Sequence, residues 1–201
     1  MIWRRARKRA DESTSECDLL DSLHTGSEEA MGELYRRHGG LVYRFSLRLV
    51  QDESLAEEIT QEVFLALLNQ AHDFDSERAS LSTWLCGIAR RQAWKQLRAQ
   101  HRHAAMPSGE ELENIESLDE DPSEILTRRE ATQAVERGIE TLPVELREVI
   151  VLCELEEMKY EDAAKVLGIP VGTVRSRLHR AKHRLAALLK VGLVQKREEG
   201  Q

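Results

Sequence analysis

Apolar side chains recur at every fourth position in one stretch of the chain, and this spacing constrains the fold more than any other feature. The stripe is formed by Leu55, Ile59, Val63 and Leu67, widened by Phe64 and Leu68. Its period matches the roughly 3.6 residues per turn of an α-helix that buries one face. Alternation of β-branched and polar residues is absent almost everywhere, so the sequence predicts an all-α fold.

Two more helices are predicted on either side of this one. The preceding helix has the apolar residues Leu41, Val42, Phe45 and Leu49. A polar loop follows at 73–80, after which Ser82 or Thr83 is placed to cap a helix over 84–98. Trp84 lies on the apolar side of that helix and is predicted to be core, whereas the position of Trp94 is left open.

The C-terminal part of the chain contains a helix-turn-helix pattern over 160–182. Ala163 and Ala164 are small where two helices must cross, and Gly168 falls at the turn, because glycine adopts positive φ without strain. The apolar residues between the helices are Ile169, Val174 and Leu178. The side chains expected on the opposite, exposed face are Arg175, Ser176, His179 and Arg180. A helical hairpin with a solvated basic face is the alternative, but the pattern favours DNA binding.

The chain of 201 residues is long enough for two small domains joined by a linker. The helical pattern fails after Gln100, and the stretch from His101 to about Pro122 is acidic with few apolar residues. We expect a basic, disordered tail at 1–20, a first domain at 21–103, a flexible acidic linker at 104–129, a second domain at 130–190 and a tail at 191–201.

The net charge of −7 conceals a strong segregation of charge along the chain. Eight acids and no Lys or Arg lie in 51–77, and eight acids and no Lys or Arg lie in 110–124. Six basic residues and no acid lie in 78–109, and nine basic residues and no acid lie in 163–197. Because surface fields are local within a Debye length of about 10 Å, this pattern predicts two polyanion-binding surfaces and an acidic surface for a basic partner.

Several classes of protein are disfavoured. No apolar run exceeds six residues, so a membrane-spanning helix is not expected, and the basic start of the chain lacks the apolar stretch of a secretory signal. Three distant cysteines do not form a disulfide framework, which favours a cytoplasmic setting. No constellation of catalytic groups is visible, so we expect neither an enzyme nor a bound metal or cofactor.

Four motifs occur in a fixed order: EEITQEVFL at 57–65, STWLCGIAR at 82–90, LPVELREV at 142–149 and PVGTVRSRL at 170–178. Together they resemble bacterial RNA polymerase sigma factors of the extracytoplasmic-function (ECF) group, over about residues 28–189. The resemblance implies two helical domains, sigma regions 2 and 4. It also implies a role in promoter recognition and transcription initiation, with the chemistry left to the polymerase.

The resemblance implies that the acidic helix docks on the β′ clamp helices of core polymerase, and that the polymerase β flap is a further partner. The implied polymerase-binding residues are Asp52, Glu57, Glu58, Gln61, Glu62 and Phe64. An anti-sigma factor is implied as a third protein partner. None of these partners requires membrane insertion.

The resemblance assigns the −10 element to region 2 and the −35 element to region 4. The implied −10 residues are Phe74, Arg78, Trp84, Arg90, Arg91, Lys95 and Arg98. The implied −35 residues are Thr173, Arg175, Ser176, Arg177, His179 and Arg180. The chain departs from many relatives at Arg91, where they have Asn. Asn pairs with base edges whereas Arg more often holds phosphate, so the −10 preference of relatives does not transfer directly.

Two other functions fit parts of this sequence. A free-standing helix-turn-helix regulator of the response-regulator type would dimerise and bind an operator without polymerase, but the acidic helix and the block around Trp84 argue against it. A helical adaptor or anti-regulator would bind protein alone, and the acid-free basic block at 163–197 argues against that.

Overall fold

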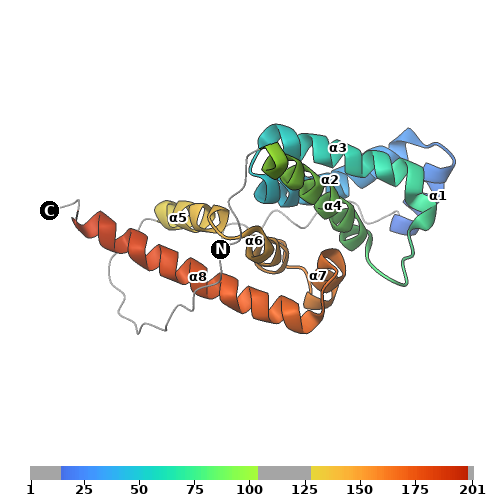
Figure 1. Ribbon diagram of the computed structural model, residues 1–201. Helices are drawn as coiled ribbons and strands as arrows, with labels where there is room; N and C mark the ends of the chain where they lie inside the picture. The colour runs from blue at the N-terminus through green and yellow to red at the C-terminus, as the bar shows by residue number, and fades with distance from the viewer. Residues whose placement is uncertain (1–14, 104–127, 199–201) are drawn as a thin grey trace.

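Figure 1 shows a computed structural model of the protein, which describes residues 15–103 and 128–198, with side chains over 15–99 and 132–190. Helices joined by short loops make up both described ranges, and neither range contains a strand. The all-α prediction is confirmed. Within these ranges, every helix is too short or too polar to cross a membrane.

The N-terminal domain is built around a long central helix. Its elements are α1 (Glu16–His24), α2 (Glu28–Val50), α3 (Glu53–Gln70), a 3-10 turn (Ala71–Asp73) and α4 (Leu81–His103). Helix α2 packs against α1, α3 and α4. The residues with no exposed surface in this domain include Leu34, Val42, Phe45, Ile59, Val63, Leu67, Leu81 and Leu85. The apolar stripe of α3 at 55, 59, 63 and 67 therefore faces the core, as its spacing predicts.

Side-chain caps set where these helices begin. Helix α2 ends at Val50, and the residue after it, Gln51, adopts the left-handed region with φ 57°. Asp52 then caps α3 by accepting a hydrogen bond from the Leu55 amide at 2.9 Å. Helix α4 begins at Leu81 because Ser80 Oγ accepts from the Thr83 amide at 3.2 Å. The predicted cap at Ser82 or Thr83 is therefore wrong, and Ser80 takes that role by the usual N-cap geometry.

Helices α1 and α8 extend into the two segments that the sequence predicts as tails. Residues 16–20 belong to α1 rather than to a disordered tail, because Leu19, Leu20 and Leu23 bury one side of that helix. Ser15 and Asp18 form a reciprocal capping box at its start. Helix α8 (Val171–Glu198) likewise extends beyond residue 190, into the predicted tail at 191–201. Residues 1–14 and most of the predicted linker lie outside the described residues.

The C-terminal domain packs three shorter helices on α8. They are α5 (Arg128–Glu140), α6 (Val144–Ile150), which continues into a π-helical turn (Val151–Leu155), and α7 (Tyr160–Leu167). All three contact α8, which runs along the lower side of the molecule in Figure 1. Helices α5 and α8 approach closely at Gly138, where a Cβ atom would lie 2.5 Å from Leu185 Cδ1.

The helix-turn-helix prediction is confirmed at the level of the backbone. Gly168 ends α7 in the left-handed region with φ 66°, and its amide donates to the Ala164 carbonyl. Val174 and Leu178 of α8 are buried between the helices. The two domains lie against each other, with α4 packed on α7 and α2 packed on α6 (Figure 1).

Candidate nucleic-acid interface

The first turns of α8 present one polar face to solvent. This recognition face consists of Arg175, Ser176, His179 and Arg180, all exposed. Val174, Leu178 and Ala181 bury the other side of the same helix, so the helix cannot rotate without exposing its core contacts. The Arg175 guanidinium lies 5.9 Å from the centre of the Tyr160 ring, a cation–π contact that orients it at the start of α8.

The structure separates two of the six residues proposed for the −35 element from this face. Thr173 is half-buried and its carbonyl accepts a hydrogen bond from Ser176 Oγ at 3.0 Å. Arg177 turns into the cleft between the two domains, and its Nη1 lies 3.7 Å from a carboxylate oxygen of Glu148, which belongs to α6 of the same domain. Its side chain is only 23% exposed. A helix has several faces, and the sequence run 173–180 does not specify which of them meets the other domain.

Helix α4 carries the second group of cations. Arg91, Lys95 and Arg98 are exposed and follow one another at spacings of four and three residues, which places them on one side of the helix. We call them the cation row. Such a row suits the phosphates of a nucleic acid, because arginine and lysine neutralise phosphate charge.

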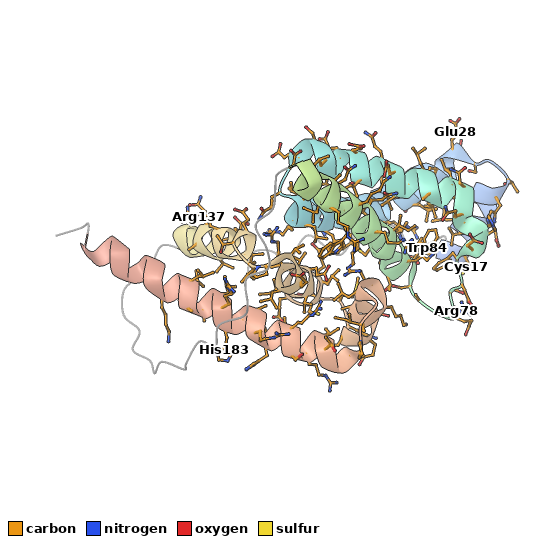
Figure 2. All side chains as sticks on the ribbon, in the orientation of Figure 1. Cys17, Glu28, Arg78, Trp84, Arg137 and His183 are labelled. Carbon is orange, nitrogen blue, oxygen red and sulfur yellow. The ribbon has the colours of Figure 1, made fainter. Side chains whose placement is uncertain are left out.

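The loop before α4 brings the remaining −10 candidates together. Phe74 packs edge-on against Trp84, with ring centroids 5.9 Å apart, and both are half-buried at the edge of the core. Arg78 is 86% exposed and forms an ion pair with Asp75 at 3.2 Å. Figure 2 shows Arg78 at the outer end of this loop and Trp84 further in, on α4.

Arg90 and Trp94 lie beside the cation row on α4, and both contact Glu148 of α6. Arg90 donates from Nε at 2.8 Å and from Nη2 at 3.1 Å, and Trp94 donates from Nε1 at 3.1 Å. Glu148 has no exposed surface. Together with Arg177 these residues form an interdomain cluster of one carboxylate and three donor side chains. This settles the orientation of Trp94, which the sequence leaves open.

A cleft of about 840 Å³ opens beside the interdomain cluster, between α4 and the C-terminal domain. Its lining residues are Arg90, Arg91, Trp94, Lys95, Arg98, Glu145, Ile169 and Arg177. The Trp94 ring has the Arg90 and Arg98 guanidinium groups each 5.8 Å from its centre. The cleft is strongly cationic, and it draws its cations from both domains.

The outer side of α3 carries the acidic residues proposed to bind polymerase. Glu57, Glu58 and Gln61 are exposed and Glu62 is half-buried. Asp52 is exposed but caps the helix, so it has a structural role as well. The structure does not fit the prediction that Phe64 binds polymerase. Phe64 is only 3% exposed and packs on Tyr35 with ring centroids 4.8 Å apart. A buried ring is not available for a partner.

Sequence reasoning missed two apolar residues on the same helix. Leu65 is 57% exposed and Leu68 is 47% exposed, although Leu68 is predicted to widen the buried stripe. Both share a face with Glu58 and Gln61, because the spacing 58, 61, 65, 68 follows the helical repeat. We call Glu57, Glu58, Gln61, Leu65 and Leu68 the docking face. Large exposed apolar side chains beside acids are typical of a protein-binding surface.

The described cysteines and histidines do not form a metal site. No group of three or more His, Cys, Asp or Glu side chains in the described ranges is arranged to hold a metal ion. Burial raises the pKa of Cys86 to about 12 and that of Cys153 to about 11, so both thiols stay protonated. Cys17 is exposed on α1.

Comparison with known families matches both domains. The family model for Sigma-70 region 2 matches residues 34–103, and the model for Sigma-70, region 4 matches residues 132–185. The ECF RNA polymerase sigma-E factor of Escherichia coli K12 is 35% identical over 173 residues, which cover 82% of this chain and 88% of that protein. The ECF RNA polymerase sigma factor SigM of Mycobacterium tuberculosis H37Rv is 30% identical over 175 residues, covering 87% and 85%.

A longer relative is the ECF RNA polymerase sigma factor SigE of Mycolicibacterium smegmatis, 30% identical, of which this chain spans 63%. Two solved structures are also similar. CnrH in complex with the cytosolic domain of CnrY superposes with a TM-score of 0.63 at 26% identity, covering 86% of this chain and 96% of that one. RpoE of Bartonella quintana in complex with the anti-sigma factor NepR gives 0.62 at 26%, covering 80% and 96%.

Proposed function

This chain belongs to the ECF group of RNA polymerase sigma factors, and from that membership we propose that it directs polymerase to promoters by reading two DNA elements with its two domains. Sigma factors act without chemistry of their own, so phosphoryl transfer stays with the polymerase, and we place the protein with polymerase in the cytoplasm. We propose residues 21–103 and 130–190 as regions 2 and 4, a division consistent with matches at 34–103 and 132–185.

One observation carries this proposal: three different surfaces of one chain suit three different contacts. The cation row on α4 and the recognition face on α8 present positive charge, and the docking face on α3 combines acidic and apolar side chains. The recognition face on α8 is proposed to read the −35 element in the major groove, where the N-terminal residues of such a helix reach base edges. Arg175 is the first exposed arginine of α8, and arginine pairs bidentately with guanine.

The −10 element is proposed to bind along α4 and the loop before it. The cation row would hold phosphates, and the loop at 73–80 with Phe74 and Trp84 at its base would receive an unstacked base. Arg91 belongs to the cation row, so we propose that it binds phosphate rather than a base edge. Arg90 reaches DNA only when it is released from Glu148.

The docking face is proposed to bind the β′ clamp helices of core polymerase, and region 4 the β flap. Glu57, Glu58 and Gln61 would meet basic side chains of the partner, while Leu65 and Leu68 would lose their exposure to water at the centre of the contact. Phe64 is removed from the set of contact residues because it supports the helix from inside.

An anti-sigma factor is proposed as the regulatory partner of this chain. The two similar solved structures are CnrH in complex with the cytosolic domain of CnrY and the sigma factor RpoE in complex with the anti-sigma factor NepR. Both superpose over most of this chain, and this similarity supports a partner of the same kind.

Transcription with purified components tests the function. Core polymerase with this protein should transcribe a template library randomised at both elements, and sequencing of the transcripts should recover two conserved blocks at a fixed spacing. Core polymerase alone is the control and should recover neither block. Transcription equal to that of core alone, together with operator-like binding by a dimer of the free protein, would instead favour a free-standing regulator.

A further inference from the structure

Glu148 is an unusual place for a carboxylate, because it is fully buried between the two domains. Burying a charge costs several kcal/mol unless partners compensate for the lost water. Both carboxylate oxygens have such partners: Oε2 accepts from Arg90 Nε at 2.8 Å and from Trp94 Nε1 at 3.1 Å, and Oε1 accepts from Arg90 Nη2 at 3.1 Å. Arg177 Nη1 approaches Oε1 at 3.7 Å.

These donors form a site that fits an oxyanion. The Arg90 guanidinium engages the carboxylate with two parallel N–H groups, and arginine presents the same pair to a phosphate. The indole N–H of Trp94 is a third donor, and Arg177 adds a second positive charge. The set therefore suits a phosphate of a nucleic acid as well as it suits Glu148.

The donors come from both DNA-reading elements of the proposed function, on which this inference rests. Arg90 and Trp94 belong to α4, and Arg177 belongs to α8. One side chain therefore holds together two helices that promoter DNA must keep apart. The −10 and −35 elements are separated by about 25 base pairs, or about 85 Å of duplex at about 3.4 Å per base pair.

The contact between the domains also includes several polar pairs. Arg44 of α2 donates to Glu156 at 3.0 and 2.7 Å, and Arg147 of α6 donates to the Leu49 carbonyl at 3.1 Å. Gln51 Nε2 donates to the Glu140 carbonyl at 2.6 Å. Polar contacts of this kind can be exchanged for contacts with DNA or polymerase.

We propose that Glu148 is an internal phosphate mimic, which closes the two domains on each other and competes with promoter DNA for Arg90, Trp94 and Arg177. In this closed state the free protein binds DNA weakly. Binding of core polymerase or of DNA replaces Glu148 and lets the domains part. When only a small fraction of the protein is in the open state that can bind DNA, its apparent affinity for DNA falls in proportion to that fraction.

The variant E148Q tests this proposal, because glutamine keeps the shape of the side chain and removes its charge. The matched control is E145Q, which removes an equal charge from the exposed part of α6 and from the lining of the same cleft. Fluorescence anisotropy measures binding of the free protein to a labelled duplex long enough to carry both elements. We expect E148Q to bind about tenfold more tightly than wild type, and E145Q to remain within about twofold.

Domain separation is measured independently by fluorescence energy transfer. Cys17 in the N-terminal domain and the site of R137C in the C-terminal domain are exposed and lie on opposite sides of the view in Figure 2, whereas Cys86 and Cys153 are buried and do not label. E148Q should change the transfer efficiency relative to wild type, and added duplex should shift wild type in the same direction. E145Q should leave the efficiency of the free protein unchanged.

Three results would overturn the proposal. The first is that E148Q has the same transfer efficiency and the same DNA affinity as wild type. The second is that E145Q and E148Q gain equally in DNA affinity. The third is that the transfer efficiency of wild type does not change when it binds the duplex. If circular dichroism shows that E148Q does not fold, R44Q takes its place, since it breaks the Arg44–Glu156 contact between the same domains. R44Q should then show the same change, and an unchanged R44Q would count against the closed state.

The outcome is separable from that of the proposed function. With core polymerase in excess, wild type and E148Q should transcribe equally, because the holoenzyme has already replaced Glu148. If wild type and E148Q both transcribe, and the two free proteins do not differ in DNA affinity or transfer efficiency, the sigma-factor function stands and the role of Glu148 as a phosphate mimic is rejected. Failure of both proteins to transcribe would instead remove the proposed function.

Discussion

The Nε2 atom of His38 in α2 lies 3.1 Å from a carboxylate oxygen of Glu16, and this contact links α1 to α2. His38 is buried in α2, and its Nδ1 lies 3.2 Å from Ser82 Oγ at the start of α4. One imidazole therefore joins three helices. Contact with His38 lowers the pKa of Glu16 below its usual 4.5, and this effect outweighs the burial that acts in the opposite direction.

The lowered pKa of Glu16 predicts an acid-sensitive attachment of α1. A carboxyl whose pKa is depressed by folding stabilises the fold above its unfolded pKa, and this contribution is lost as pH falls through the folded value. The melting temperature of E16Q should therefore be below that of wild type at about pH 7, and the gap should narrow below about pH 4.5. D21N, on the exposed side of α1, is the control and should melt like wild type at each pH. A gap that is constant with pH would contradict the role of this ion contact.

The docking face predicts a separation of binding from folding on α3. L65S and L68S should lower co-purification with core polymerase and leave the unfolding transition in place, because both leucines are exposed. F64A should instead lower the free energy of unfolding by about 3–5 kcal/mol, because Phe64 is buried against Tyr35 and makes no contact with a partner. Urea unfolding and pull-down with core enzyme measure the two effects.

Charge reversal tests the acidic residues of α3 on and beside the docking face. E57K and E58K, combined with reversal at Glu62, should abolish binding to core polymerase while the helix content by circular dichroism stays that of wild type. Unchanged co-purification of the triple variant would remove the clamp-helix contact from the proposed function.

The recognition face predicts different roles for Arg175 and Lys182. R175A should cost about 1–3 kcal/mol in holoenzyme binding and relax preference at one −35 base pair, because Arg175 is exposed at the start of α8. Lys182 forms an ion pair with Glu154 at 2.9 Å, which raises its pKa, so K182A should weaken all sequences equally or not at all. Binding to a set of −35 variants at two salt concentrations measures both. Equal losses without sequence preference would move base reading to Ser176, His179 or Arg180.

Two glycines in the helix-turn-helix predict opposite effects of the same substitution. Gly168 has φ 66°, so G168A should destabilise the C-terminal domain by about 1–2 kcal/mol. Gly172 lies within α8 with nothing within 4 Å of an added Cβ, so G172A should stabilise it by about 0.5–1 kcal/mol. Thermal unfolding of the full chain measures both, and a stabilising G168A would contradict the turn geometry.

The sequence by itself determined the features that depend on neighbouring residues. The spacing of Ile59, Val63 and Leu67 identified a buried helix face, and Gly168 identified the turn before α8, because both signals act within a few residues of the backbone. Motif order also identified the family, which the region 2 and region 4 matches show.

The tertiary structure decided which of several chemically similar residues faces which surface. Phe64 and Leu68 are both apolar and both adjoin the stripe, yet Phe64 meets Tyr35 and Leu68 meets water, since the packing of α2 covers only one of them. Arg90 and Arg91 are adjacent in sequence, but only Arg90 reaches Glu148, 58 residues away. Such a pairing depends on how two domains pack, and helical periodicity specifies only the faces of each helix, not what lies opposite them.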